Sequence, residues 1–398
     1  MDWLDLFYFL LGAVIFFGAV LYRRGEWNEE YTSLKQTKML TGIAALGVAL
    51  HHIAQKSCAS WHPKRFIVHG LDVFVDMGFI LVAVFFFCSG LGLYKSFRTK
   101  PGYLKGFLRR RVLPLVIAYY LSEVIYLIIR AAMGEPTGAV DVIWYLSGLH
   151  MANMNAWYLV IIPLFYLIFW LAFRFCRHEG TAILWVFIGV LLYTVGCACV
   201  DHQNDWWIRG EWWYNSVILF PLGILFGRFE KPLTKVFRKG YILWLAASML
   251  SVYGAMRLSD LVINHWGGFY GENWGDRLKV IHRLGSAGSQ WLICIVVVWF
   301  CFLLMMKVRI GNRVLAWFGA VSLDFYLAHG VFVELFGYNF LDQRSSLVYI
   351  RDVPTYLLAV LSCGIVATLI FRLLRKGILR VTGLEPARAS EPSVRREE

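Results

Sequence analysis

The chain has 398 residues, of which 59% are hydrophobic and only 16% are charged, and its mean hydropathy is +0.59. A soluble domain is about 45–50% apolar and about 25% charged, so this composition excludes an ordinary soluble globule. The apolar residues form long runs separated by short charged loops, a pattern typical of polytopic membrane proteins. Membrane barrels are excluded because their strands appear as alternating segments of about ten residues. We expect an all-α transmembrane bundle with ten or eleven spans and no large soluble domain.

Eleven apolar runs are candidate spans. They cover residues 3–22, 39–56, 72–94, 112–131, 156–173, 181–200, 214–228, 240–256, 289–306, 316–337 and 355–374. The run 214–228 is short and contains Pro221, which predicts a broken or re-entrant crossing. The first run carries Asp2 and Asp5 at its start and Arg23-Arg24 after its end, the reverse of a cleaved signal peptide. We therefore expect it to be retained as a span.

The runs divide the chain into three parts. Residues 1–35 form an extra N-terminal span with a cytoplasmic linker, and residues 36–375 form the main membrane domain. Residues 376–398 are polar and contain proline, so they are expected to form a disordered cytoplasmic tail.

Charge predicts the orientation. The net charge is +13, from 39 Lys and Arg against 26 Asp and Glu. With the loop after the first span in the cytoplasm, 28 of the 39 basic residues fall on that side, as the positive-inside rule requires. The sequence thus predicts a multi-pass protein of the plasma or inner membrane, with its N-terminus outside and its C-terminus in the cytoplasm. Because the membrane accounts for the basic surplus, no nucleic-acid partner is expected.

The eight cysteines lie mostly inside apolar runs and form no CxxC pair. Cys197 and Cys199 are too close in sequence for a usual zinc or redox spacing. We interpret all eight as small core residues and expect no metal site.

Ionisable residues inside the apolar runs are few, and a bilayer makes them costly. Lys38 begins the second run, and His51-His52 follow about 20 Å further along the helix axis. Adjacent helical residues point about 100° apart, so only one of these histidines can face the interior fully. The pair is either functional or placed in a wet outer vestibule.

Three further polar features lie just before the fourth run, within it and within the tenth run. Arg109-Arg110-Arg111 are either positive-inside determinants that contact lipid headgroups or a site for a polyphosphorylated cytosolic ligand. Glu123, about three turns further in, serves either structural pairing or catalysis. In the tenth run Ser322, Tyr326 and His329 share one helix face, which predicts a polar cavity rather than lipid beside them.

Tryptophans of the predicted outer loops alternate with Asp, Asn and Gln, around residues 201–213 and 265–276. They serve either as interfacial anchors or as stacking surfaces for sugars.

Six motifs in this order resemble the integral-membrane acyltransferase family 3, which includes O-acetyltransferases acting on cell-envelope polysaccharides. The resemblance covers roughly residues 36–375. The matching segments are Thr41–His52, Phe85–Gly90, Arg109–Pro114, Trp157–Leu159, Phe220–Gly223 and Ser322–Gly330. The family's first motif places an Arg eleven residues before the His. This chain has Thr41 there, and Lys38, one turn earlier on the same face, could substitute.

The resemblance implies a membrane-bound acyltransferase. It would move an acyl group, most often acetyl, from cytosolic acyl-CoA to a hydroxyl of a cell-envelope glycan or lipid-linked sugar. Acyl-CoA (acetyl-CoA) would be a co-substrate, no cofactor would be bound permanently, and membrane lipid would surround the protein. The acceptor, the acyl length and the oligomeric state stay open.

Such a transfer needs a base, cations for the CoA phosphates and donors for the oxyanion. The catalytic candidates are His52 as general base or acylated residue, His329 and Asp324 as orienting or relaying groups, and Glu123. The acyl-CoA-binding candidates are Lys38, Arg109, Arg110, Arg111 and Ser89. The candidates for substrate or oxyanion contacts are Trp157, Tyr158, Ser322 and Tyr326.

Two other classes of membrane protein remain as alternatives to an acyltransferase. A transporter or flippase of a lipid-linked sugar would also need a polar cavity, but it would more often show broken helices in repeated halves, which are not visible here. A sensor or structural membrane protein would leave His52 replaceable. Loss of acyl-CoA-dependent activity on replacing His52 would exclude both.

Overall fold

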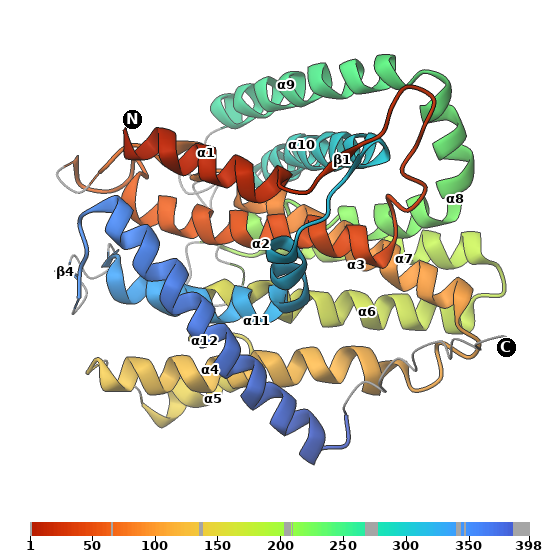
Figure 1. Ribbon diagram of the computed structural model, residues 1–398. Coiled ribbons are helices and arrows are strands. Elements are labelled where there is room, and N and C mark those ends of the chain that lie inside the picture. The colour runs from red at the N-terminus through yellow and green to blue at the C-terminus, as the bar shows by residue number, and fades with distance from the viewer. Residues whose placement is uncertain are drawn as a thin grey trace, which may run out of the picture.

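The protein is an all-helical bundle, as predicted. The computed structural model describes residues 2–64, 67–134, 138–202, 208, 210–266, 278–339, 344–345 and 348–384. Within these residues there are twelve α-helices (Figure 1): α1 Trp3–Phe16, α2 Leu34–Ser57, α3 Gly78–Thr99, α4 Leu113–Ala132, α5 Ala139–Ser147, α6 Trp157–Phe175, α7 Glu179–Cys199, α8 Leu219–Lys239, α9 Tyr241–Trp266, α10 Lys279–Lys307, α11 Arg313–Phe336 and α12 Val353–Val381. The strands are two-residue pairs, β1 Val20–Leu21 with β2 Val308–Arg309 and β3 Tyr338–Asn339 with β4 Arg344–Ser345.

Eight of the described helices are long and apolar enough to cross a membrane. They are α3, α4, α6, α7, α9, α10, α11 and α12. Their outer surfaces expose large apolar side chains, such as Ile242, Leu243 and Leu250 of α9. In water these surfaces would be unfavourable, so lipid is the solvent that suits them. The more polar α2 lies inside the bundle against α11, α3 and α12, where protein rather than lipid surrounds it.

Two parts of the chain differ from the sequence-based expectation. The first span was predicted over 3–22, but α1 has 14 residues, about 21 Å, and stops before Gly18, whose positive φ of 70° turns the chain into β1. The tail was expected to be disordered from residue 376. Instead α12 continues to Val381 because Leu379 is buried against the bundle. Residues 385–398 and the tryptophan-rich segments 203–207 and 267–277 lie outside the described residues.

The run around Pro221 is only partly helical: Pro221 itself lies in the first turn of α8. Residues 214–218 are non-helical yet almost fully buried, and α8 begins only at Leu219. Irregular backbone at membrane depth is tolerated where protein surrounds it. The Trp291 indole donates to the Tyr214 carbonyl oxygen at 2.9 Å. α8 then packs closely on α3. Gly90 and Gly223 allow this approach, because a Cβ on either residue would collide with the backbone of the other helix.

Contacts sort the loops into two faces. On one, the basic face, the linker 17–33 meets the ends of α3, α8 and α10: Lys307 Nζ donates to the Arg23 and Glu26 carbonyl oxygens at 2.8 and 2.6 Å. On the opposite face, the Tyr8 hydroxyl donates to the Gly70 carbonyl oxygen at 2.8 Å. The start of α1 and β4 lie at one end of the bundle in Figure 1, and the α6–α7 connection lies at the other. Among the described loops, the linker 17–33 lies beside the C-terminal ends of α3, α8 and α10, as alternating spans predict.

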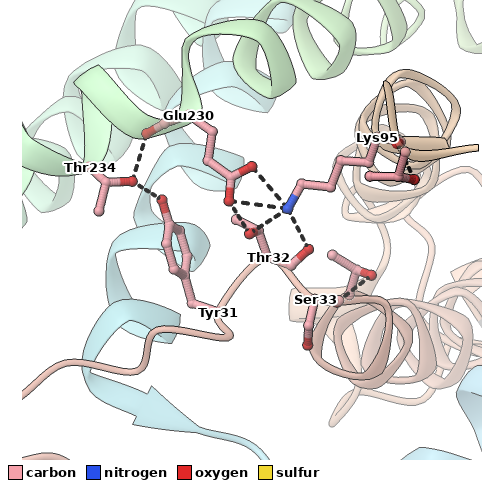
Figure 2. Close-up of polar contacts among 8 residues, drawn as sticks. Tyr31, Thr32, Ser33, Lys95, Glu230 and Thr234 are labelled. Carbon is pink, nitrogen blue, oxygen red and sulfur yellow. Dashed lines mark hydrogen bonds and ion pairs between the residues drawn. The ribbon is translucent and has the colours of Figure 1, made fainter. Parts of the chain in front are cut away.

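A polar cluster attaches the linker to the basic face (Figure 2). Lys95 Nζ of α3 contacts both Glu230 of α8, at 2.9 Å, and the Thr32 hydroxyl, at 2.6 Å. The Tyr31 hydroxyl lies 2.6 Å from Thr234 Oγ1. Burial raises the pKa of the Tyr31 phenol to about 12, so this hydroxyl remains a proton donor at neutral pH. Ser33, which follows Thr32 in the chain, caps the N-terminus of α2 and thereby links the cluster to that helix.

Candidate active site

A cavity of about 500 Å³ lies between α2, α3, α4, α6, α11 and α12. Its wall contains four cations, Lys38, Lys100, Arg111 and Arg375. Hydroxyl groups from several helices line it as well: Thr37, Thr41, Ser89, Ser96, Tyr158, Tyr166, Ser322 and Tyr326. Such a set of cations and hydroxyl groups suits a ligand that carries phosphate.

Two glycines bring α2 and α11 together along this cavity. A Cβ on Gly42 would lie 2.5 Å from the Leu315 carbonyl oxygen, and one on Gly319 would collide with the Lys38 carbonyl oxygen. Only glycine permits this approach. As a result Lys38 and Ser322 line the same cavity, although they are far apart in sequence.

Beyond the cavity, α2 and α11 also bring two histidines into contact. His52 Nδ1 lies 2.9 Å from His329 Nε2, and the two rings are nearly coplanar, with an interplanar angle of 7°. His329 is fully buried, and its Nδ1 lies 2.8 Å from the Phe325 carbonyl oxygen. Tyr326, which lines the cavity, lies one turn before His329, at 6.4 Å between ring centroids.

The hydrogen bonds of this pair determine where its protons lie in the neutral state. The Phe325 carbonyl can only accept, so His329 Nδ1 carries its proton and His329 Nε2 presents a lone pair. His52 Nδ1 must then donate to His329, which leaves a lone pair on His52 Nε2. That atom has no hydrogen-bond partner among the described residues. The arrangement prepares His52 Nε2 to accept a proton or to attack a carbonyl carbon.

His51 has a different position. Its Nδ1 donates to the Phe74 carbonyl oxygen at 2.9 Å, and its ring packs against Gly78, where a Cβ would overlap it. It therefore anchors the segment before α3. Of the two adjacent histidines one joins the pair and the other does not, in keeping with their 100° separation.

Asp324, predicted together with His329 to orient or relay, is paired with another helix. Its carboxylate accepts two hydrogen bonds from the Arg375 guanidinium, at 2.6 and 2.9 Å, and it is 1% exposed. The Phe325 carbonyl orients His329 instead. Arg375 was missed by sequence reasoning because α12 contributes many basic residues and nothing local marks this one.

Glu123 is also held away from the cavity. Its carboxylate accepts hydrogen bonds from the backbone N–H groups of Ala152, at 2.7 Å, and Asn153, at 3.2 Å. The Asn153 amide in turn donates to the Ser122 hydroxyl at 2.8 Å. These bonds satisfy the backbone N–H groups of a buried loop between α5 and α6. Of the two roles considered for Glu123, structural pairing and catalysis, these contacts favour structural pairing.

The three consecutive arginines point in different directions. They form a single π-helical turn, Leu108–Val112. Arg111 lines the cavity and donates to the Tyr103 hydroxyl at 3.1 Å. Arg109 donates to the Gly383 carbonyl oxygen at 3.1 Å, and Arg110 donates to the Tyr103 carbonyl oxygen at 3.1 Å. Only Arg111 of the three is in the cavity wall.

Of the remaining candidates, four line the cavity and one does not. Ser89 and Tyr158 share a hydrogen bond of 3.2 Å, and both line the cavity with Ser322 and Tyr326. The Tyr326 hydroxyl is buried without a hydrogen-bond partner in the part of the chain that the structure describes. Trp157 is not in the wall: it packs between Phe86 and Trp213, with ring centroids 6.4 and 6.2 Å away. The described His, Cys, Asp and Glu residues form no group of three or more placed to hold a metal ion.

Comparison with known proteins identifies the domain. Residues 38–373 match the acyltransferase 3 family, described as an acyltransferase domain. No curated protein and no solved structure gives a match. The matched region begins at Lys38 and ends just before Arg375, so it covers α2 to most of α12 and includes the histidine pair. Because the match covers most of the chain and the fold is a transmembrane helical bundle, the protein belongs to the acyltransferase 3 family and is a membrane acyltransferase.

Proposed function

We propose that the protein transfers an acyl group, acetyl in the first instance, from cytosolic acyl-CoA to a hydroxyl of a cell-envelope glycan or lipid-linked sugar. The observation that carries the proposal is the cavity with its four cations, which ends at Tyr326, one turn before the His52–His329 pair. Phosphates of a nucleotide-type carrier need cations, and the transfer step needs a base further in. The cavity wall and the histidine pair are arranged in that order.

The donor is proposed to enter from the basic face. Arg111, Lys100 and Lys38 would bind its phosphates, since guanidinium and ammonium groups form charge-assisted hydrogen bonds to phosphate oxygens. Arg375 would add a fourth cation, whose orientation Asp324 determines. The positive-inside rule places this face in the cytoplasm, where acyl-CoA is made. The acyl arm would then extend along α2 toward His52, about 20 Å from Lys38.

In the transfer step, His52 Nε2 would accept the proton of the acceptor hydroxyl. The acceptor oxygen attacks the thioester carbon, a C–O bond forms, the C–S bond breaks and CoA leaves as a thiolate. The imidazolium of His52 then returns the proton to the thiolate sulfur. The Tyr326 hydroxyl, buried and without a described partner, is the proposed donor to the oxyanion.

Membrane vesicles of defined orientation test the proposal. Inverted vesicles expose the cytoplasmic face, so radiolabelled acetyl-CoA should transfer its label to envelope glycan or lipid in these vesicles and not in right-side-out ones. His52→Ala should abolish the transfer, and replacement of the exposed His178 on the basic face should not. Transfer that persists in His52→Ala vesicles would reject His52. Ester-linked acyl groups on envelope glycans, compared with and without the gene, would identify the acceptor class.

The same protein without acceptor separates the two roles open to His52. If His52 is acylated, acyl-CoA alone should leave the protein one acyl group heavier by intact mass. If His52 acts only as base, the mass stays unchanged and CoA is released only when acceptor is added.

A further inference from the structure

The C-terminal half of α8, residues 229–239, is amphipathic in a way the transfer site does not use. At 100° per residue, Phe229, Leu233 and Phe237 share one side of the helix. With α10 and neighbouring residues, this side lines an apolar cavity of about 340 Å³. Phe229 is itself 43% exposed, so this cavity is open at that residue.

The other side of the same half-helix carries a row of lysines. Lys231, Lys235 and Lys239 follow i, i+4, i+8 spacing, and all three are exposed. None of them makes an ion pair or a hydrogen bond to any residue that the structure describes. Two of their neighbours are engaged with other elements: Glu230 with Lys95, and Arg238 with Glu29 at 2.6 Å. The lysine row is thus presented outward, while the neighbouring Glu230 and Arg238 hold the helix in place.

The setting of α8 is that of an interfacial helix. In Figure 1 the part of α8 that leads to α9 lies at one end of the bundle and runs transverse to α6 and α10. Val236, 51% exposed, lies about 60° around the helix from Lys239, so an exposed apolar side chain borders the lysine row. Amphipathic helices with basic polar faces lie in the headgroup region of membranes, with their apolar faces toward the acyl chains.

We propose that residues 229–239 of α8 bind an anionic phospholipid. Its phosphate group lies on the lysine row, and one acyl chain passes Phe229 into the apolar cavity between α8 and α10. The lipid must be anionic because three unpaired cations in a row attract negative headgroups and gain nothing from zwitterionic ones. It must be a lipid rather than a free anion because the exposed Val236 borders the row and an apolar cavity opens at Phe229 on the same half-helix.

Lipid titration of the purified full-length protein in neutral detergent tests the proposal. The probes are phosphatidylglycerol and phosphatidylcholine with the same acyl chains, and binding is counted by native mass spectrometry. The wild type should bind phosphatidylglycerol more tightly. The triple variant Lys231→Gln, Lys235→Gln, Lys239→Gln should lose this preference by tenfold or more, because each lysine near an anionic headgroup contributes about fivefold.

A matched control keeps the change in net charge and removes the row. The variant Lys35→Gln, Arg177→Gln, Lys376→Gln takes three exposed and scattered cations from the basic face, and it should keep the preference. Equal loss in both triple variants would overturn the proposal in favour of general surface charge. Equal binding of both lipids to the wild type would overturn it outright.

A second variant tests the acyl-chain part. Leu233→Trp fills the apolar cavity, so it should weaken binding of both lipids by a similar factor. Competition by glycerol phosphate, which has the headgroup charge without the chains, should be negligible. Displacement of the lipid by glycerol phosphate at concentrations comparable to the lipid's would show a soluble-anion site instead. Unchanged melting temperatures of both variants in detergent exclude misfolding as the cause.

Discussion

Replacing His329 distinguishes its role from that of His52. His329 is proposed to act through His52, because its Nε2 accepts the His52 Nδ1 proton and so directs the His52 lone pair to Nε2. The bond is a single hydrogen bond of 2.9 Å between neutral rings. Such a bond contributes about 0.5–1.5 kcal/mol net, which corresponds to a factor of roughly 2–13 in rate. Removal of the base itself costs about 10²–10⁴-fold.

We therefore expect His329→Ala to lower kcat about tenfold and His52→Ala to lower it by at least a hundredfold. His329→Gln should recover most of the loss, because the Gln Oε1 atom can accept from His52 Nδ1. The assay is release of the CoA thiol by purified protein in the presence of acceptor, with melting temperature measured on each variant. His329 is fully buried, so the alanine variant is compared with the glutamine variant to separate folding from proton placement.

Two results would refute this reasoning. If His329→Ala lost as much activity as His52→Ala and Gln gave no recovery, His329 would be the base and His52 its partner. If His52→Ala kept more than about a tenth of the wild-type rate, His52 would not be the base. His178→Ala, at an exposed position, serves as the control and should be indistinguishable from wild type.

The remaining predictions concern the cavity wall, the buried loop and the orientation. Arg111→Ala should raise the KM for acyl-CoA tenfold or more with little change in kcat, since one charge-assisted hydrogen bond contributes about 1.5–3 kcal/mol; a pure kcat effect would contradict donor binding. Asp324→Ala should destabilise the protein by about 3–5 kcal/mol in thermal unfolding, because it leaves a largely buried guanidinium unpaired; an unchanged melting temperature would contradict this. Glu123→Gln should cost about 1–2 kcal/mol of stability and leave kcat within about threefold, whereas a large loss of rate at normal stability would make Glu123 catalytic. In a cysteine-free background an impermeant thiol reagent on intact cells should label His69→Cys and not Lys235→Cys; the reverse would invert the orientation.

The sequence alone was sufficient to predict the class of fold. Hydrocarbon offers no hydrogen-bond partner to the backbone, so each long apolar run must satisfy its N–H and C=O groups internally, and the helix is the one local way to do so. That is why the positions of α4, α6, α7 and α11 are close to their runs. The same reasoning failed at α1, where Gly18 ends the helix early, since a short helix at the edge of a bundle has no neighbour that requires full length.

Part of the candidate site was also visible in the sequence. Helical periodicity placed Ser322 and Tyr326 of α11 on one face, and both line the cavity. Helix length placed His52 far from Lys38 along α2. These are local properties, because a helix has one geometry and its sequence therefore predicts which side chains share a face.

Only the tertiary structure decided which groups meet. Asp324 bonds to Arg375, 51 residues away, and His52 bonds to His329, 277 residues away. Periodicity within one helix says nothing about the rotation of its neighbour, and that rotation depends on contacts such as Gly42 against Leu315. The Phe325 carbonyl that orients His329 carries no side-chain signature at all. The residues that could do chemistry were therefore readable from local sequence, but their partners and proton positions were set by how the helices pack against one another.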